Sequence, residues 1–267
     1  MGDIIAERSA SILRIQLNRP AKKNAMTSSM YVNLADIFDE AARDDAVRVV
    51  LWHGAGGSFT AGNDVEDFLK NPPGAGPSPQ ARLMTALVNF DKPLVAAVQG
   101  AAVGGGTTML THCDFVFAGE STKFQMPFIN IGLVPEFGSS FSIPNRIGYL
   151  RAAELFLLGT PFDAGRAAQL GLVTQVVPDE NLLATAMETA RKLAQKPMEA
   201  LRAGKRLLRL STREHVEQAI RRENEEFDLR LRSPEAREAF SAFLEKRKPD
   251  FTKAAAVTAS IQTYESR

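Results

Sequence analysis

Short apolar runs separated by stretches of helical spacing limit the fold of this chain more than any other feature. The runs cover residues 47–54, 92–100 and 115–120, and the first two end in glycine. Runs this short and apolar predict buried strands. Between them apolar residues recur at helical spacing, as in Met30, Leu34, Phe38 and Ala41. The alternation predicts an α/β domain with crossover connections.

The C-terminal part has a different pattern. Beyond about residue 180 only helical spacing remains. Ser233, followed by Pro234 and Glu235, is typical of a helix start. The last two helices are expected to carry an apolar stripe for core or subunit contact, formed by Val216, Ile220, Phe227, Leu231, Phe240, Phe243 and Leu244. We therefore divide the chain into a core over 1–200 and a helical region over 201–267.

Composition bounds the class of protein. The chain has 267 residues, of which 45% are hydrophobic, and a formal net charge of +1, so no nucleic-acid or membrane partner is expected. Its single cysteine, Cys113, excludes an internal disulfide and fits a reducing compartment. The N-terminus lacks the pattern of a secretory signal. A cytoplasmic location is therefore expected. Residues 71–80 are expected to form a loop, because this segment is rich in proline and glycine.

A run of three glycines, Gly104 to Gly106, follows the predicted strand at 92–100. The spacing fits neither a dinucleotide-binding fingerprint nor a P-loop. Glycines at a strand-to-helix junction allow unusual φ values and expose the first amides of the helix to a ligand. Close packing of a helix on a sheet explains the same glycines equally well.

A second turn of this kind lies at 54–68, where the sequence AGND leads into a short helix that Asp64 could cap. Each of the two turns could offer one amide. Two amides that donate to one carbonyl oxygen would stabilise an enolate or a tetrahedral oxyanion. Each amide would lower the reaction barrier by about 3 kcal/mol.

With these motifs the chain resembles the crotonase superfamily, the enoyl-CoA hydratases and isomerases, over essentially its full length. The matching segments lie at 18–26, 58–68, 92–110, 113–140, 165–178 and 243–251. The resemblance implies a core of repeated ββα turns, a helical C-terminal trimerisation region, and trimers that often pair into hexamers. It also implies acyl-CoA thioester substrates of fatty acid metabolism and no separate cofactor, since coenzyme A enters with the substrate.

The resemblance also implies roles for individual residues. The oxyanion hole would be formed by the N–H groups of Asn63 and Gly105, with Asp64 defining the turn beside it. The positions that correspond to coenzyme A contacts are Lys23, Ala61, Phe227, Phe243 and Lys246. Without the resemblance, the two phenylalanines would be read as core and Lys246 as a solvated charge.

Hydratases of this family use two glutamates, whose positions are occupied here by Thr108 and Phe128. Neither side chain can act as a general base near neutral pH. Glu136, eight residues after Phe128, resembles the glutamate of the peroxisomal type of Δ3,Δ2-enoyl-CoA isomerase. This chain has Phe137 where the isomerase turn carries a small residue. Taken without the family, Glu136 would be a first-turn helix residue.

A site lined by Phe128 and Phe137 would raise the pKa of Glu136 by desolvation. Other thioester reactions, including hydration, and a non-catalytic CoA- or RNA-binding role remain alternatives. A basic cluster could favour RNA, or form a solvated helix face, at Arg202, Lys205, Arg206 and Arg209. The three histidines lack metal-ligand spacing, so no metal site is expected, and His112 and Cys113 are interpreted as packing residues.

Overall fold

A six-stranded sheet forms the base of the molecule. The computed structural model describes residues 2–70 and 78–252. The strands, in order across the sheet, are β1 (Ile4–Ser9), β2 (Ile12–Leu17), β3 (Val49–Gly54), β4 (Leu94–Val98), β6 (Phe115–Gly119) and β9 (Gln175–Val177). β1 and β2 pair antiparallel, and the later pairs are parallel. The three apolar runs are thus three adjacent strands, as predicted.

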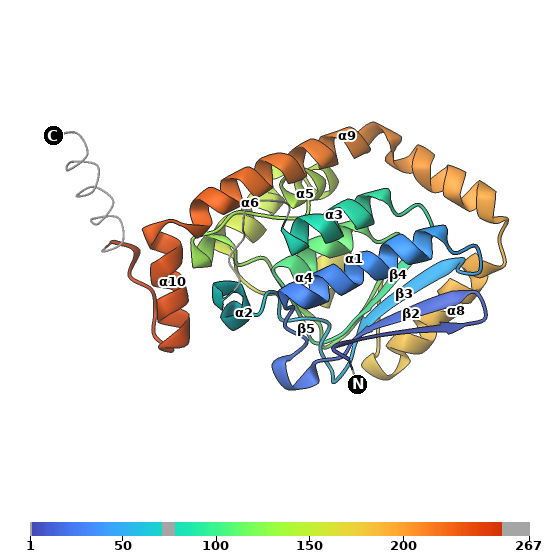
Figure 1. Ribbon diagram of the computed structural model, residues 1–267, viewed down its shortest axis with the longest axis horizontal. Coiled ribbons are helices and arrows are strands. Elements are labelled where there is room, and N and C mark those ends of the chain that lie inside the picture. The colour runs from blue at the N-terminus through green and yellow to red at the C-terminus, as the bar shows by residue number, and fades with distance from the viewer. Residues whose placement is uncertain (1, 71–77, 253–267) are drawn as a thin grey trace.

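Helices cover both faces of this sheet (Figure 1). α1 (Ser28–Arg43) and α3 (Pro79–Asn89) lie on one face, and α8 (Leu182–Ala194) lies on the other. Successive residues of β3 alternate between the two faces: Trp52 packs edge-on against Phe38 of α1, whereas Leu51 belongs to the cluster beneath α8. Both faces are buried, which explains why these strands are apolar throughout.

A smaller sheet places the glycine-rich segment. It contains β5 (Ala101–Val103), β7 (Lys123–Gln125) and β8 (Phe162–Asp163). Gly100 separates β4 from β5 with φ +57°, and a Cβ there would lie 2.0 Å from the Gly57 carbonyl oxygen. β5 leads directly into α4 (Gly105–Thr108), so β4, β5 and α4 form one ββα unit.

The remaining helices lie at the other end of the molecule or along its surface. They are α2 (Val65–Lys70), α5 (Ser139–Ile147), α6 (Tyr149–Leu158), α7 (Ala164–Gln169), α9 (Met198–Leu231) and α10 (Pro234–Leu244). The long helix α9 contacts α3 and α5, and α10 projects at its end (Figure 1). In the described ranges, no helix has both the length and the apolar character that a bilayer crossing requires.

Two details of the expected elements differ in the structure. Residues 71–77 of the expected loop lie outside the described ranges, but Pro79 and Gln80 already belong to α3, because the Ser78 side chain caps the helix at the Ala81 N–H. The C-terminal stripe is only partly buried: Phe227 and Phe240 are buried, whereas Phe243 is 61% exposed and Leu244 52%. Ser233 caps α10 as predicted.

Candidate active site

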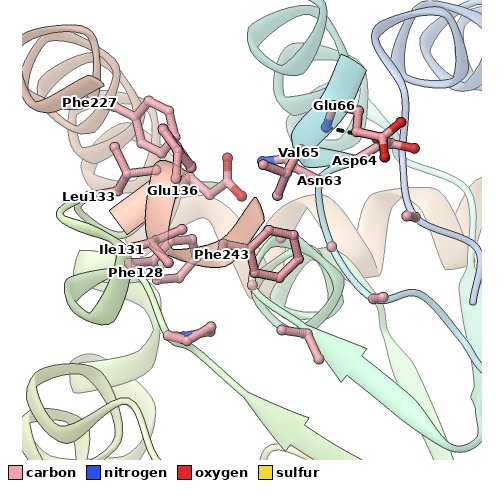
Figure 2. A pocket seen from close by; sticks show the side chains of 18 of the residues that line it. Asn63, Asp64, Val65, Glu66, Phe128, Ile131, Leu133, Glu136, Phe227 and Phe243 are labelled. Atoms are coloured by element: carbon pink, nitrogen blue, oxygen red, sulfur yellow. Dashed lines mark hydrogen bonds between the residues drawn. The ribbon is translucent and has the colours of Figure 1, made fainter. Parts of the chain in front are cut away.

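A cavity of about 360 Å³ opens between the two glycine turns and the C-terminal helices. One wall comes from residues 61–66 and 103–105, and another from Phe128, Ile131 and Leu133. The C-terminal helices close it with Phe227, Phe240 and Phe243. The cavity is mainly apolar, and few polar side chains face it (Figure 2).

Glu136 lies at the inner end of this cavity. Its side chain is 3% exposed, and its Oε1 atom has no hydrogen-bond partner in the described part of the chain. Burial raises the pKa of Glu136 to about 8; the charge of Glu223 adds to this, and the Gly105 N–H opposes it. A buried carboxyl with a raised pKa and an unused oxygen is suited to accept a proton. It is not the surface charge that its place before a helix would suggest.

A different physical constraint explains why each position of the run 104–106 is a glycine. Gly104 adopts φ +57°. A Cβ on Gly105 would lie 2.7 Å from Glu136 Oε1, and one on Gly106 would lie 2.4 Å from Thr60 Cγ2. A side chain at Gly105 would thus meet the carboxyl of the cavity, whereas one at Gly106 would meet the packing of the neighbouring turn.

The AGND turn faces the same carboxyl. Figure 2 shows the Asn63 side chain and the Glu136 carboxyl pointing toward one another across the cavity. In the described part of the chain, neither the Asn63 N–H nor the Gly105 N–H donates to a backbone carbonyl. No backbone carbonyl therefore competes for either amide, although the Gly105 N–H is directed at the Glu136 carboxyl.

Asp64 has a structural role next to them. Its Oδ1 accepts the N–H groups of Glu66 and Asp67, and so it caps α2 as predicted. Its Oδ2 accepts a hydrogen bond of 2.6 Å from Arg19. Burial acts to raise the pKa of Asp64, but the Arg19 hydrogen bond and the two amides outweigh it and lower the pKa. Asp64 therefore stays ionised and positions the turn.

Tyr31 of α1 also reaches the site, which the sequence did not reveal. Its side chain is fully buried, and its hydroxyl donates a hydrogen bond of 2.7 Å to Asn63 Oδ1. Burial raises its pKa well above the ordinary value, and the charge of Glu136 adds to this, so the hydroxyl remains a donor. In the sequence Tyr31 stands next to Met30 on the apolar side of the predicted helix. Nothing there distinguishes it from a core residue.

The two positions that carry glutamate in hydratases hold no acid here. The Thr108 side chain is buried and donates a long hydrogen bond of 3.4 Å to the Gly104 carbonyl oxygen. The Phe128 ring lines the cavity. Two other acidic residues line the cavity. Asp64 forms an ion pair with Arg19, and Glu66 is exposed on the rim, where it lies 3.8 Å from Lys22.

The residues expected at coenzyme A fall into two groups. Ala61, Phe227 and Phe243 line the cavity. Lys23 and Lys246 do not line it; both are exposed and have left-handed backbone angles. Lys22 lines the cavity next to Lys23. The roles of all five expected residues stay predictions.

The other candidates have structural explanations. His112 Nε2 lies 2.8 Å from the Phe137 carbonyl oxygen, and burial raises the pKa of Cys113 to about 12. Among the described residues, no three His, Cys, Asp or Glu side chains could hold a metal ion. Two members of the basic cluster on α9 pair with acidic residues: Lys205 is buried and lies 2.7 Å from Asp114, and Arg202 lies 3.0 Å from Asp91.

Comparison with known proteins identifies relatives over nearly the whole chain. A family model described as enoyl-CoA hydratase/isomerase matches residues 7–254. The chain is 35% identical to 1,2-epoxyphenylacetyl-CoA isomerase of Escherichia coli, covering 93% of this chain and 98% of that one. It is 33% identical to 2,3-dehydroadipyl-CoA hydratase of the same organism, covering 94% and 99%.

An isomerase and a solved structure also match. Human enoyl-CoA delta isomerase 2 is 34% identical over 80% of this chain and 56% of its own length. The crystal structure of an enoyl-CoA hydratase/isomerase from Pseudoalteromonas atlantica is 37% identical, with a TM-score of 0.89, and covers 93% of this chain and 99% of that one. Named isomerases and hydratases are thus similarly close to this chain.

Proposed function

Because the chain belongs to the enoyl-CoA hydratase/isomerase family, we propose that it moves the double bond of a 3-enoyl-CoA ester from C3 to C2. The observation that carries the proposal is the position of Glu136, a buried carboxyl with a raised pKa that lies beside the Gly105 N–H and faces Asn63 across the cavity. One acid–base group suffices for this reaction, whereas hydration also requires an oriented water.

The two amides would bind the thioester oxygen. With that oxygen between the N–H groups of Asn63 and Gly105, negative charge developing on it is stabilised without reorganisation of solvent. Each such donor lowers the barrier by about 3 kcal/mol. The hydrogen bond from Tyr31 holds the Asn63 side chain and thus supports the turn.

Glu136 would then carry one proton between two carbons. Its carboxylate takes a proton from C2, and the electron pair left behind spreads over a dienolate whose charge rests on the thioester oxygen. The protonated Glu136 returns that proton to C4, and the double bond is left between C2 and C3. The apolar walls, including Phe128 and Leu133, keep water from the dienolate.

The coenzyme A part of the substrate would be held by residues at the cavity wall and by two lysines beyond it. We assign Lys23, Ala61, Phe227, Phe243 and Lys246 to coenzyme A, with Asp64 shaping the surface beside it. No cofactor besides the substrate's own coenzyme A enters this scheme. A trimer or a dimer of trimers in the cytoplasm is part of the same proposal.

Hydration of a 2-enoyl-CoA is the second candidate, favoured by the similarity to a hydratase over 94% of the chain. It would require Glu136 to act alone on a bound water, since Thr108 and Phe128 carry no acid. A panel of 2- and 3-enoyl-CoA esters separates the two reactions. Fast hydration of crotonyl-CoA without isomerisation of any 3-enoyl-CoA would show that the protein is a hydratase.

The decisive variant is Glu136→Gln, which keeps the shape of the side chain and removes the base. We expect isomerisation of a 3-enoyl-CoA to fall about 10²- to 10⁴-fold. Glu188→Gln, on the exposed surface of α8 and outside the cavity lining, is the control and should keep turnover within about twofold. Near-normal turnover of Glu136→Gln would refute the assignment.

A further inference from the structure

The turn that carries Glu136 has an unusual backbone. Phe137 adopts φ +65° and Gly138 φ +70°, so two successive residues lie in the left-handed region. For a non-glycine residue this conformation costs about 1–2 kcal/mol. Such a turn persists only where the surrounding structure holds it.

A buried carboxylate from α9 binds this turn. Glu223 Oε2 accepts a hydrogen bond of 2.6 Å from the Gly138 N–H, and Oε1 accepts one of 2.7 Å from the Ser140 N–H. Glu223 is 6% exposed. Gly138 has no side chain to cap α5, so Glu223 supplies the cap from a helix 85 residues away in sequence. Burial raises the pKa of Glu223, and the hydrogen bonds from Ser140 and Gly138 oppose that rise by stabilising the ionised form.

The opposite side of the turn is held by a histidine. His112 Nε2 lies 2.8 Å from the Phe137 carbonyl oxygen. Burial lowers the pKa of His112 to about 4, and the charge of Arg209 adds to this, so the ring is neutral and donates its N–H. The carbonyl and the N–H of the Phe137–Gly138 peptide are thereby both held, by residues from two different elements.

We propose that Glu223 is a positioning residue for Glu136: it holds the 136–140 turn and thereby the carboxyl that the turn carries. Glu223 is not among the residues that line the cavity, so it acts through Glu136 and not on substrate. The proposal rests on the proposed function only for the identity of the substrate.

Electrostatics support the same assignment. Four groups face the 136–140 turn from elements packed against it: the Tyr31 hydroxyl, the Gly105 N–H, the neutral His112 ring and the Glu223 carboxylate. Glu223 is the one anion among them. Burial is the largest cause of the raised pKa of Glu136, and the charge of Glu223 is the second. A stronger base results, because a like charge nearby opposes ionisation.

The test compares three variants by direct titration and by kinetics. Glu223→Gln removes the charge but keeps one acceptor, and Glu223→Asp keeps the charge but withdraws it by one methylene. Glu225→Gln, an exposed residue of the same helix, is the control. The Glu136 carboxyl is titrated by ¹³C NMR on protein labelled at glutamate Cδ, with its signal assigned through Glu136→Gln. No substrate is needed for this measurement.

For Glu223→Gln we expect the pKa of Glu136 to fall by about one unit. With a 3-enoyl-CoA we expect kcat to fall about tenfold to hundredfold, with KM changed less than about twofold. Glu223→Asp should keep the raised pKa and still lose kcat. The control should change neither quantity.

The inference is overturned if Glu223→Gln titrates and turns over like Glu225→Gln, or if its loss of kcat equals its loss of folded protein at an unchanged pKa. Should Glu223→Gln not fold, Glu223→Asp decides: wild-type kcat in that variant overturns the inference. If the wild type fails to isomerise 3-enoyl esters while the titration shifts as expected, the proposed function fails and the role of Glu223 stands.

Discussion

The Tyr31 hydroxyl donates a hydrogen bond of 2.7 Å to the side-chain oxygen of Asn63, the residue whose amide faces the Glu136 carboxyl. This bond links helix α1 to the AGND turn. It also fixes which end of the Asn63 amide points away from Tyr31, so the NH₂ group points into the cavity. A buried tyrosine thus orients a polar group that the ligand would meet.

Tyr31→Phe should therefore weaken the site while leaving the fold intact. The ring remains in the core, and the lost hydrogen bond costs about 1 kcal/mol of unfolding free energy. Because Asn63 can then rotate, we expect kcat for isomerisation to fall about tenfold. Steady-state kinetics and urea unfolding check both expectations. Tyr149→Phe removes the hydroxyl of a tyrosine that is 73% exposed and should change neither. Equal kinetics in the two variants would remove Tyr31 from the site.

The pH dependence of the reaction should reflect the raised pKa of Glu136. The free enzyme needs the ionised carboxyl to take the C2 proton, so kcat/KM should rise with pH and level off above the pKa of about 8. Stopped assays between pH 5 and 10 with a fixed salt concentration measure the profile. A profile that is already level at about pH 6 would mean that Glu136 has an ordinary pKa or is not the base.

Glu136 should also make stability depend on pH. Its pKa is about 8 in the fold against an ordinary 4.5, so between these values the folded state retains a proton that the unfolded state loses. Stability from this group is complete below pH 4.5 and is lost as pH rises through 8. The Glu136→Gln variant has no ionisable group at this position, so it does not lose this stability as pH rises. At pH 9 we expect the variant to be more stable than the wild type by at least about 1 kcal/mol, with the difference shrinking toward pH 5. Urea unfolding at the two pH values gives the comparison, and a constant difference would contradict it.

Gly105 should not tolerate a side chain. The Cβ of Gly105→Ala would lie 2.7 Å from Glu136 Oε1 and 3.4 Å from the Tyr31 hydroxyl oxygen. The carboxyl must move, and we expect kcat to fall about 10²-fold because a shift near 1 Å has that effect. Gly204→Ala in α9 is the control, because a Cβ there meets nothing within 4 Å. That variant should keep full activity and gain about 0.5–1 kcal/mol of stability. Full activity of Gly105→Ala would place the reacting group elsewhere.

The strands of the main sheet were predictable because their pattern is local. The runs that became β3, β4 and β6 are apolar on both faces, so no tertiary information is needed to recognise them. The Ser233 cap is local for the same reason. The start of α3 was placed incorrectly, because Ser78 and Pro79 were read with the proline-rich stretch before them and not as a helix start.

The candidate site was predictable only where a residue had a recognisable motif around it. Asn63, Gly105 and Glu136 each stand in such a motif. Tyr31 and Glu223 do not, since one sits on an apolar helix face and the other among the charges of α9. Their roles depend on contacts over 32 and 85 residues of sequence. Such contacts appear only once the chain is folded.

The exposed leucines of α9 predict self-association. Leu207, Leu208 and Leu210 are 70%, 85% and 70% exposed. Large apolar side chains exposed together on one stretch of helix are typical of protein contact surfaces. We expect the 29.1 kDa chain to sediment as a trimer or a dimer of trimers. Leu208→Arg places a charge in that surface and should shift the protein toward smaller species, whereas Glu188→Arg, on the exposed side of α8, should not. Sedimentation velocity over a hundredfold range of concentration measures both variants, and a wild type that stays monomeric throughout would refute the prediction.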